Sequence, residues 1–330
     1  MTNKTVLVAL MLGMLMMLSF AIPVLVPFRQ ALAMYFRSVW WAILLGLTVG
    51  GIIDYYIPQE YFSFLLAKRQ KRTILNAIGL GFLMSVCSHG ILAIAVQLYK
   101  KGASTSAVIA FLLSSPWANL PITLMLIGFF GLTKALYIMF SAMIIALTTG
   151  WIYQLLEHHR LVETNSQTLD VTQDYSVLGD MKKRFRQYRF SGEQLKKDIC
   201  GIFSSSAALS NMVLWWILVG IGLASLAGAY IPQHFFHQYM GPTLGGMLVT
   251  LATATVIEVC SEGTAPLAFE IFRQTGALGN SLVFLMAGVA TDYTEIGILW
   301  QNIGRKAACW LPAIAVPQIV FWGTIANIIF

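Results

Sequence analysis

Charged side chains are scarce in this chain of 330 residues, in which Asp, Glu, Lys and Arg make up 11% and hydrophobic residues 58%. Soluble domains usually carry roughly 25% charged residues. Together with a mean hydropathy of +0.73, this excludes a water-soluble fold. The formal net charge of +7 does not indicate nucleic acid as a partner, because no domain rich in Lys and Arg stands apart from the apolar segments. Membrane topology explains the basic residues better.

Cysteines are few, and the motifs of several enzyme classes are missing. The four cysteines, Cys87, Cys200, Cys260 and Cys309, lack the dense spacing of a secreted disulfide scaffold. The sequence has no Walker loop, dinucleotide fingerprint or HExxH motif, which argues against direct ATP hydrolysis and those enzyme classes. We therefore predict a protein that is not an enzyme and needs no cofactor, with the question of a metal left open.

Long apolar runs are what the sequence has in abundance. A bilayer core of about 30 Å needs about 20 mostly apolar residues per helix, and lipid offers backbone groups no partners. The runs therefore predict an all-α polytopic membrane protein. The first run resembles a signal peptide but exceeds the usual apolar core of about 7 to 15 residues, so we expect an uncleaved helix. The segments are Val6 to Phe28, Val39 to Ile57, Ile74 to Tyr99, Ser104 to Leu132, Ala135 to Leu156, Met212 to Tyr230, Leu244 to Ile271, Ala277 to Trp300 and Cys309 to Phe330.

An internal duplication organises these segments. We expect an N-terminal transmembrane helix and loop (1–38), a first membrane repeat (39–156), a cytoplasmic linker (157–199) and a second membrane repeat (200–330). The duplication rests on five ordered matches at an offset of about 174 positions. They pair Trp40-Trp41 with Trp215-Trp216, Ile57-Pro58-Gln59 with Ile231-Pro232-Gln233, Cys87-Ser88-x-Gly90 with Cys260-Ser261-x-Gly263, Gly102-Ala103 with Gly276-Ala277, and Phe111-Leu112 with Phe284-Leu285.

The distribution of basic residues selects a topology, because Lys and Arg concentrate in cytoplasmic loops. If the two CSxG segments enter and leave the membrane by the same face, only Arg29, Arg37, Lys134 and Arg273 of the 21 Lys and Arg residues lie outside. Each half then has three complete crossings, so the repeat is inverted, with two re-entrant helical hairpins. Inverted repeats whose broken helices meet near the bilayer midplane are typical of secondary transporters.

The bends of the two predicted hairpins carry the first candidate site residues. Glycine permits a sharp turn, and the free amides and helix ends at such a bend can bind an ion or a polar substrate. Thiolate, imidazole and carboxylate together suit a soft cation or a trivalent thiophile. An equally weighted alternative is that the cysteines only pack and that the histidine is buried with its hydrogen bonds satisfied. The residues are Cys87, Ser88, His89 and Gly90 in the first bend, and Cys260, Ser261, Glu262 and Gly263 in the second.

Acids within the second hairpin favour function over packing. A carboxylate deep in lipid costs several kcal/mol and usually marks a cavity, a partner or a proton relay. Glu258 and Glu262 are four residues apart and would share one face of a continuous helix, whereas a break at Cys260 would separate them. Glu262 is also equivalent to His89 in the duplication, so the two bends pair an acid with a base.

A second pair of interruptions follows the hairpins. Pro116 and Pro121 remove backbone hydrogen bonds and break or kink one span. Its counterpart in the second half contains Thr291 and Asp292, of which Asp292 aligns with Asn119, and Glu295 follows one turn later. We expect these breaks to face the hairpin bends around one cavity; the alternative is a packing kink.

These residues give the chain a resemblance to the YraQ-type predicted permeases, the family that includes the organoarsenical efflux permease ArsP. The resemblance covers roughly Val39 to Lys306 and implies a permease. At the first bend the family pattern is CSCG, whereas this chain has His89 in place of the second cysteine, so a two-sulfur chelate of a trivalent arsenical is not implied. The sequences that carry it are Cys87-Ser88-His89-Gly90, Lys101-Gly102-Ala103-Ser104, Ser115-Pro116-Trp117-Ala118-Asn119, Cys260-Ser261-Glu262, Ala287-Gly288 and Thr291-Asp292.

The sequence therefore predicts a multi-pass permease of the inner membrane, a secondary transporter that exports a small solute. An organoarsenical or another thiophilic, toxic species is one candidate cargo. Two alternatives stay open: a channel or metal-ion permease that uses Cys87, His89, Cys260 and Glu262, and a non-transporting membrane subunit. The expected partners are a small-molecule or ion substrate and the lipid bilayer, and a homo-oligomer is left open.

Overall fold

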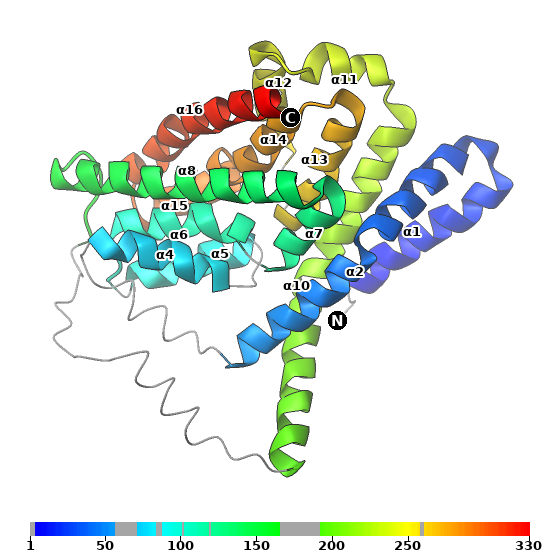
Figure 1. The fold of residues 1–330 in the computed structure, drawn as a ribbon. Helices are drawn as coiled ribbons and strands as arrows, with labels where there is room; N and C mark the ends of the chain where they lie inside the picture. Colours follow the sequence, from blue (N-terminus) through cyan, green and yellow to red (C-terminus); the bar gives the residue numbers. More distant parts are fainter. Residues whose placement is uncertain are drawn as a thin grey trace.

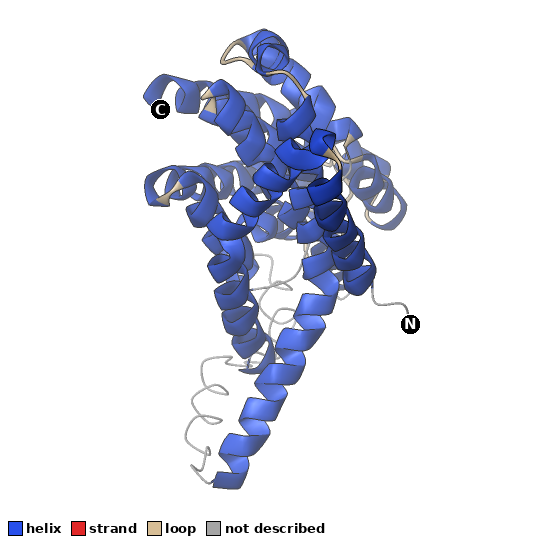
Figure 2. Ribbon diagram, turned by 90° about the vertical axis from the view of Figure 1, so that its right-hand side faces the viewer, coloured by secondary structure: helices blue, strands red, loops and turns tan. Residues whose placement is uncertain are grey.

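The computed structural model describes residues 4–56, 71–83, 88–100, 102–118, 120–165, 192–257 and 261–330, and every regular element within these ranges is a helix (Figures 1 and 2). Within them, six helical segments are long and apolar enough to cross a membrane. The expected all-α, multi-pass membrane protein is confirmed. These segments are Lys4–Ala21, Pro23–Ile52, Leu132–His158, Val213–Tyr230, Leu278–Asn302 and Arg305–Ile329.

The N-terminal region contains more helix than the sequence predicts. Helix α1 (Lys4–Ala21) is followed by the short 3-10 helix η1 (Pro23–Leu25), and α2 (Val26–Tyr56) then runs through residues 29–38, where we expect a loop. Proline has no backbone N–H and so ends α1. The chain then continues as a helix because Phe28, Leu32, Tyr35 and Val39, spaced at three and four residues, are all buried.

Both halves contain the same series of helices after this region. The first series is α4 (Lys71–Leu83), α5 (Ser88–Lys100), α6 (Thr105–Ala118), α7 (Leu120–Phe130) and α8 (Leu132–His158). The second series follows α10 (Gly192–Tyr230) and α11 (Gln233–Met240), and it consists of α12 (Leu244–Val256), α13 (Ser261–Thr275), α14 (Leu278–Ala290), α15 (Tyr293–Asn302) and α16 (Arg305–Ile329). In the second half, α12 ends before the CSxG sequence and α14 ends before Thr291 and Asp292, as expected. In the first half, the corresponding residues 84–87 and 119 lie outside the described ranges.

Glycines with a left-handed backbone occur at equivalent places in the two series. Gly102 (φ 97°) and Gly276 (φ 69°) precede α6 and α14, and Gly131 (φ 78°) and Gly304 (φ 153°) precede α8 and α16. Side chains with a Cβ are disfavoured in this conformation, so glycine is required at these turns. The turns as well as the helices therefore follow the duplication.

Packing between helices follows the duplication too. A Cβ on Gly150 of α8 would lie 2.9 Å from both Ile74 of α4 and Ala110 of α6. A Cβ on Gly323 of α16 would lie 2.8 Å from Val283 of α14 and 3.3 Å from Met247 of α12. Each of these contacts joins residues at equivalent positions, so α8 packs on α4 and α6 as α16 packs on α12 and α14.

The long helices α8 and α16 run antiparallel. Early in α8, Tyr137 donates a hydrogen bond to the carbonyl oxygen of Trp322, late in α16 (2.9 Å). Late in α8, Tyr153 donates to the carbonyl oxygen of Ala307, early in α16 (2.6 Å). Figure 1 shows the two helices in green and red above one another.

Two polar clusters define the ends of this helix bundle. At the Glu163 end, the Glu163 carboxylate accepts from the backbone N–H groups of Lys306 (3.0 Å) and Ala307 (2.9 Å) at the start of α16, while its carbonyl accepts from Thr105 at the start of α6. At the Asn327 end, Asn327 accepts from the N–H of Gly279 at the start of α14 (2.6 Å). Helices α6 and α14 therefore begin at opposite ends of α16.

Replacing Glu163 with alanine is expected to lower the free energy of unfolding by about 1 kcal/mol, the usual value of a side chain that accepts from first-turn N–H groups. Burial opposes its charge, but the two N–H donors outweigh burial, and the pKa of Glu163 lies below its ordinary value of 4.5. Because the folded pKa is depressed, this stability is complete above the ordinary pKa and is lost as the pH falls through the lower value. The melting temperatures of the purified protein and the variant should differ by a constant amount from pH 6 to 8, and the difference should disappear in acid. A difference that grows in acid would contradict this account.

Candidate functional site

The structure describes part of the predicted site. Cys87, Asn119, Glu258 and Cys260 lie outside the described residues. Ser88, His89 and Gly90 begin α5, and Pro116 lies in the last turn of α6. The remaining candidates, whose positions are described in full, are Pro121, Ser261, Glu262, Gly263, Thr291, Asp292 and Glu295.

Glu262 lies in the first turn of α13, within the second CSxG sequence. Its side chain is 1% exposed, and the hydroxyl of Ser261 donates to its Oε2 (3.0 Å). The positive end of the helix dipole stabilises a carboxylate in a first turn. The bend therefore presents a buried acid at the start of a helix.

Asp292 and Glu295 lie at the start of α15, after the second break. The Asp292 side chain is the N-cap of this helix and accepts from the backbone N–H groups of Thr294 (2.7 Å) and Glu295 (3.3 Å). Both acids are buried. Asp292 therefore fixes the helix start, and Glu295 adds a second buried carboxylate within its first turn.

Side-chain contacts bring the second bend and the second break together. The hydroxyl groups of Thr291 and Thr255, the latter near the end of α12, are 2.6 Å apart. A Cβ on Gly288 of α14 would lie 3.9 Å from Thr264, one turn into α13. Thr291, directly after α14, therefore lies against α12, and α14 lies against the first turn of α13.

Equivalent helices contact one another between the two halves. Helix α5 contacts α15, α7 contacts α13, and the equivalent helices α6 and α14 contact each other. Because α5 and α13 are equivalent, as are α7 and α15, the first two contacts are related by the duplication. Helices α5 and α7 of the first half thus pack on α15 and α13 of the second half.

Helices α2 and α10 cover α7 and α13 by close backbone contact. A Cβ on Gly46 of α2 would lie 2.6 Å from the Cα of Pro121, and one on Gly220 of α10 would lie 2.2 Å from the carbonyl oxygen of Gly263. Glycine is needed at both places because the opposing atoms are backbone. Pro121 and Gly263, both predicted site residues, are therefore where the helix starts meet their covering helices.

Trp117, near the end of α6, is a buried hydrogen-bond donor for which the sequence predicts no role. The Trp117 side chain is 1% exposed, and its Nε1–H has no hydrogen-bond partner in the part of the chain that the structure describes. A buried polar group of this kind usually has a ligand, water or functional explanation. The signal in the sequence is a tryptophan between the two prolines that break the helix.

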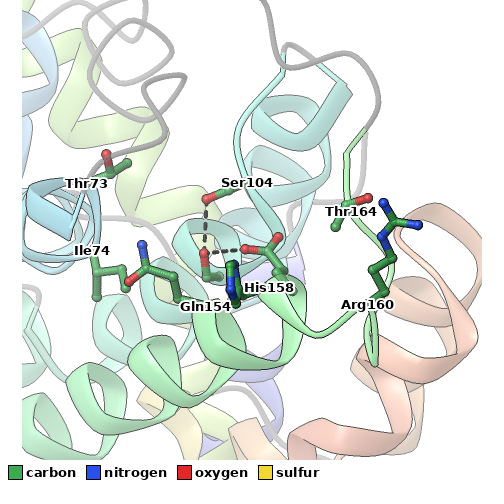
Figure 3. Close-up of a pocket in the computed structure, with 9 residues that line it drawn as sticks. Thr73, Ile74, Ser104, Gln154, His158, Arg160 and Thr164 are labelled. Carbon is green, nitrogen blue, oxygen red and sulfur yellow. Dashed lines mark hydrogen bonds between the residues drawn. The ribbon is translucent and has the colours of Figure 1, made fainter.

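A separate cavity of about 490 Å³ lies at the Glu163 end (Figure 3). Glu157 at its wall accepts from the N–H of Thr105 (2.9 Å) and the hydroxyl of Ser106 (2.8 Å), which fixes the start of α6. None of the predicted site residues lines it, so this cavity is not the predicted site. Its lining residues are Thr73, Ile74, Ser104, Ser106, Gln154, Glu157, His158, Arg160 and Thr164.

Metal ligation receives no support from the described residues, which contain no group of three or more His, Cys, Asp and Glu side chains placed to hold an ion. The described acids at the start of α15 instead bond to backbone N–H groups or lie in first turns. What this part of the site offers is buried carboxylates at helix starts.

Comparison with known proteins agrees with this architecture. A UPF0718 protein of Bacillus subtilis, YcgR, is 23% identical over 77% of this chain and 81% of its own length. A Streptococcus mutans protein named as a subunit of a two-component membrane permease complex is 21% identical over 80% of this chain and 83% of its own. A Mycobacterium tuberculosis protein named as a permease is 27% identical over 73% of this chain and 61% of its own. No solved structure matches the chain significantly.

One family matches nearly the whole chain, and its description is that of a permease. The match runs over residues 28–328, which includes both series of helices and both interruptions in each. The resemblance predicted from the sequence is thereby confirmed at the level of the family. The chain is a multi-pass membrane protein that belongs to the predicted permease family ArsP_1.

Proposed function

We propose that the protein is a secondary transporter of the inner membrane that exports a small solute through a central site. The site is formed by the two hairpin bends and the two helix breaks, and its carboxylates couple solute movement to protons. The observation that carries this proposal is the placement of Glu262, Asp292 and Glu295, all buried, at the starts of helices that follow interruptions. Buried acids in membrane helices typically mark transport pathways and proton relays.

The directions of equivalent helices support an inverted arrangement of the halves. Helices α8 and α16 run antiparallel, and α6 and α14 begin at opposite ends of α16. Two halves related in this way can present the same site to either side of a membrane. The re-entrant hairpins and the cytoplasmic linker between the halves are part of the same proposal.

A second candidate function is a permease subunit that works only with a partner. The Streptococcus mutans relative, named as a subunit of a two-component permease complex, favours it. A channel or metal-ion permease with Cys87, His89, Cys260 and Glu262 as ligands is the third, and it depends on residues that include ones outside the described ranges.

Solute flux into liposomes that contain this chain alone tests the proposal. The probes are phenylarsine oxide, methylarsenite, arsenite, antimonite, cadmium and zinc, each measured with and without an imposed pH gradient. We expect uptake of at least one probe to exceed that of empty liposomes and to increase when a proton gradient of the right sign is applied.

The other outcomes separate the candidates. Flux that runs down the solute gradient and ignores the pH gradient would indicate a channel. Stoichiometric binding of cadmium or zinc by purified protein would indicate a metal-ion permease. Absence of flux for this chain alone, together with flux in membrane vesicles from cells that express the chain, would indicate a subunit that needs a partner.

A further inference from the structure

A charged cluster outside the central site, built on the buried carboxylate of Glu270 and the exposed guanidinium of Arg273, joins three helices at the Asn327 end of the bundle. Glu270 of α13 is 0% exposed and accepts from Arg273 twice, from Nε (2.9 Å) and from Nη2 (2.7 Å). It also accepts from Gln274 (2.6 Å) and from the hydroxyl of Tyr35 on α2. Gly228 of α10 lies so close that a Cβ there would be 2.4 Å from Glu270 Oε1.

An aromatic layer surrounds this cluster. The Tyr35 ring packs edge-on against Phe129 of α7 (5.9 Å between centroids) and Phe269 of α13 (6.0 Å), and those two phenylalanines are stacked (4.9 Å). Phe130 packs on Phe269 as well. The cluster therefore lies where the ends of α7 and α13 meet α2 and α10.

In the part of the chain that the structure describes, the contacts of the covering helices α2 and α10 are not repeated between the two halves. Helix α2 packs on α7 and α10 packs on α13, whereas within the described ranges no comparable contact joins α10 to α15 or α2 to α5, the pairs that the duplication would give. Helices α7 and α13 end at the Asn327 end, while α5 and α15 end at the Glu163 end, where Asn165 bonds to Tyr99 and Glu163 to Lys306. The structure thus fastens α2 and α10 over one end of the group formed by α5, α7, α13 and α15.

The first half has no carboxylate to fasten α2 and α10 to α5. The position in α5 that corresponds to Glu270 is Gln97, and Arg273 corresponds to Lys100. While α2 and α10 remain packed on α7 and α13, the central site cannot open toward the end of the bundle at which α7 and α13 end. Transport from both sides of a membrane requires the contact to break and form again in each cycle.

We propose that Tyr35, Glu270 and Arg273 form a latch that closes the Asn327 end of the transport pathway, and that opening requires the Tyr35–Glu270 bond to break. The proposal rests on the transport function proposed above. In the open state α2 and α10 leave α7 and α13 and take up the duplicated contacts, Gly46 against the start of α5 and Gly220 against the start of α15. The bond can serve as a latch because a hydrogen bond to a buried carboxylate is strong, and its loss shifts an equilibrium by about tenfold or more.

Thiol accessibility at the interface beneath the latch tests this. Ala224 lies midway between Gly220 and Gly228 at a spacing of four residues, on the face of α10 toward α13, and it is buried. The thiol introduced by Ala224→Cys should react slowly with a maleimide. Adding Tyr35→Phe or Glu270→Gln should raise the labelling rate at position 224 by about tenfold or more, with the site of labelling read by mass spectrometry.

Two controls make the result decisive. Tyr137→Phe removes another hydroxyl bond between helices, to Trp322, and should leave the rate at position 224 unchanged. A second thiol from Ala146→Cys, buried in α8, should stay slow in every variant, because general unfolding would expose both positions. Unchanged protection at position 224 in both latch variants, or equal exposure at 146, would overturn the latch. Since labelling needs no solute, failure of the transport proposal would appear separately, in the flux assay.

Discussion

Replacing Glu262 with glutamine is expected to reduce proton-coupled flux to the level of empty liposomes while leaving the amount of folded protein unchanged. The carboxylate is buried in the first turn of α13 and accepts from Ser261 (3.0 Å), and glutamine retains the shape and the acceptor. What glutamine lacks is a titratable proton. The loss should therefore appear in coupled transport, and the measurement is flux in proteoliposomes with and without a pH gradient.

Matched variants distinguish coupling from structure. Glu262→Asp keeps a titratable group and should retain part of the coupled flux. Glu157→Gln alters another buried acid, whose carboxylate bonds to Thr105 and Ser106 at the start of α6, and should lower stability but keep coupling. Full coupled flux in Glu262→Gln would remove this carboxylate from the mechanism, and coupled flux lost equally in Glu157→Gln would indicate a structural effect instead.

Much of the fold follows from local signals that the sequence contains. Apolar length predicts the spans, and the CSxG sequences and the prolines near Asn119 predict interruptions because glycine and proline disfavour a continuous helix. The matched dipeptides predict two series of helices, and the turn glycines Gly102 and Gly276 occur at matched positions. These features depend on residues close together in the chain, which is why they are visible without a structure.

The start of α2 illustrates a local signal that fails. Arg29 and Arg37 interrupt the apolar run and predict a loop, yet the helix begins at Val26. The guanidinium of Arg29 lies over the ring of Phe20 in α1 (4.3 Å), and the apolar stripe that contains Leu32 and Tyr35 is buried. Hydropathy predicts a loop because of the two arginines, but tertiary packing stabilises a helix there.

The latch shows what the sequence could not provide. Glu270 lies near the end of the predicted segment Leu244 to Ile271 and Arg273 lies just beyond it, at a spacing that lets the two side chains pair on one helix. Tyr35 is 235 positions away, in the stretch predicted as a loop. A contact of this kind follows only from how α2 lies across α13, and no periodicity in either segment specifies it.

Gly220→Ala, which adds one methyl group to α10, is expected to destabilise the folded protein strongly. The added Cβ would lie 2.2 Å from the carbonyl oxygen and 2.7 Å from the Cα of Gly263, so relief requires the backbones of α10 and α13 to separate. Overpacking usually costs about 1–3 kcal/mol, and we expect the upper end or more because no flexible side chain can move aside. The melting temperature should fall by several degrees and flux should be lost, since Gly263 adjoins Glu262.

Gly222→Ala is the matched control, because it adds the same methyl group two residues away in the same helix. Its Cβ would lie 3.1 Å from Cδ2 of Leu12, a side chain that can rotate, and alanine favours the helix by up to about 1 kcal/mol. We expect a melting temperature within a degree or two of the parent and normal flux. The latch adds a sharper expectation for Gly220→Ala: since it destabilises the fastened state, the thiol of Ala224→Cys should label faster in its presence even where the protein remains folded. Equal stability and equal labelling for Gly220→Ala and Gly222→Ala would mean that α10 does not press on the start of α13 as the structure describes.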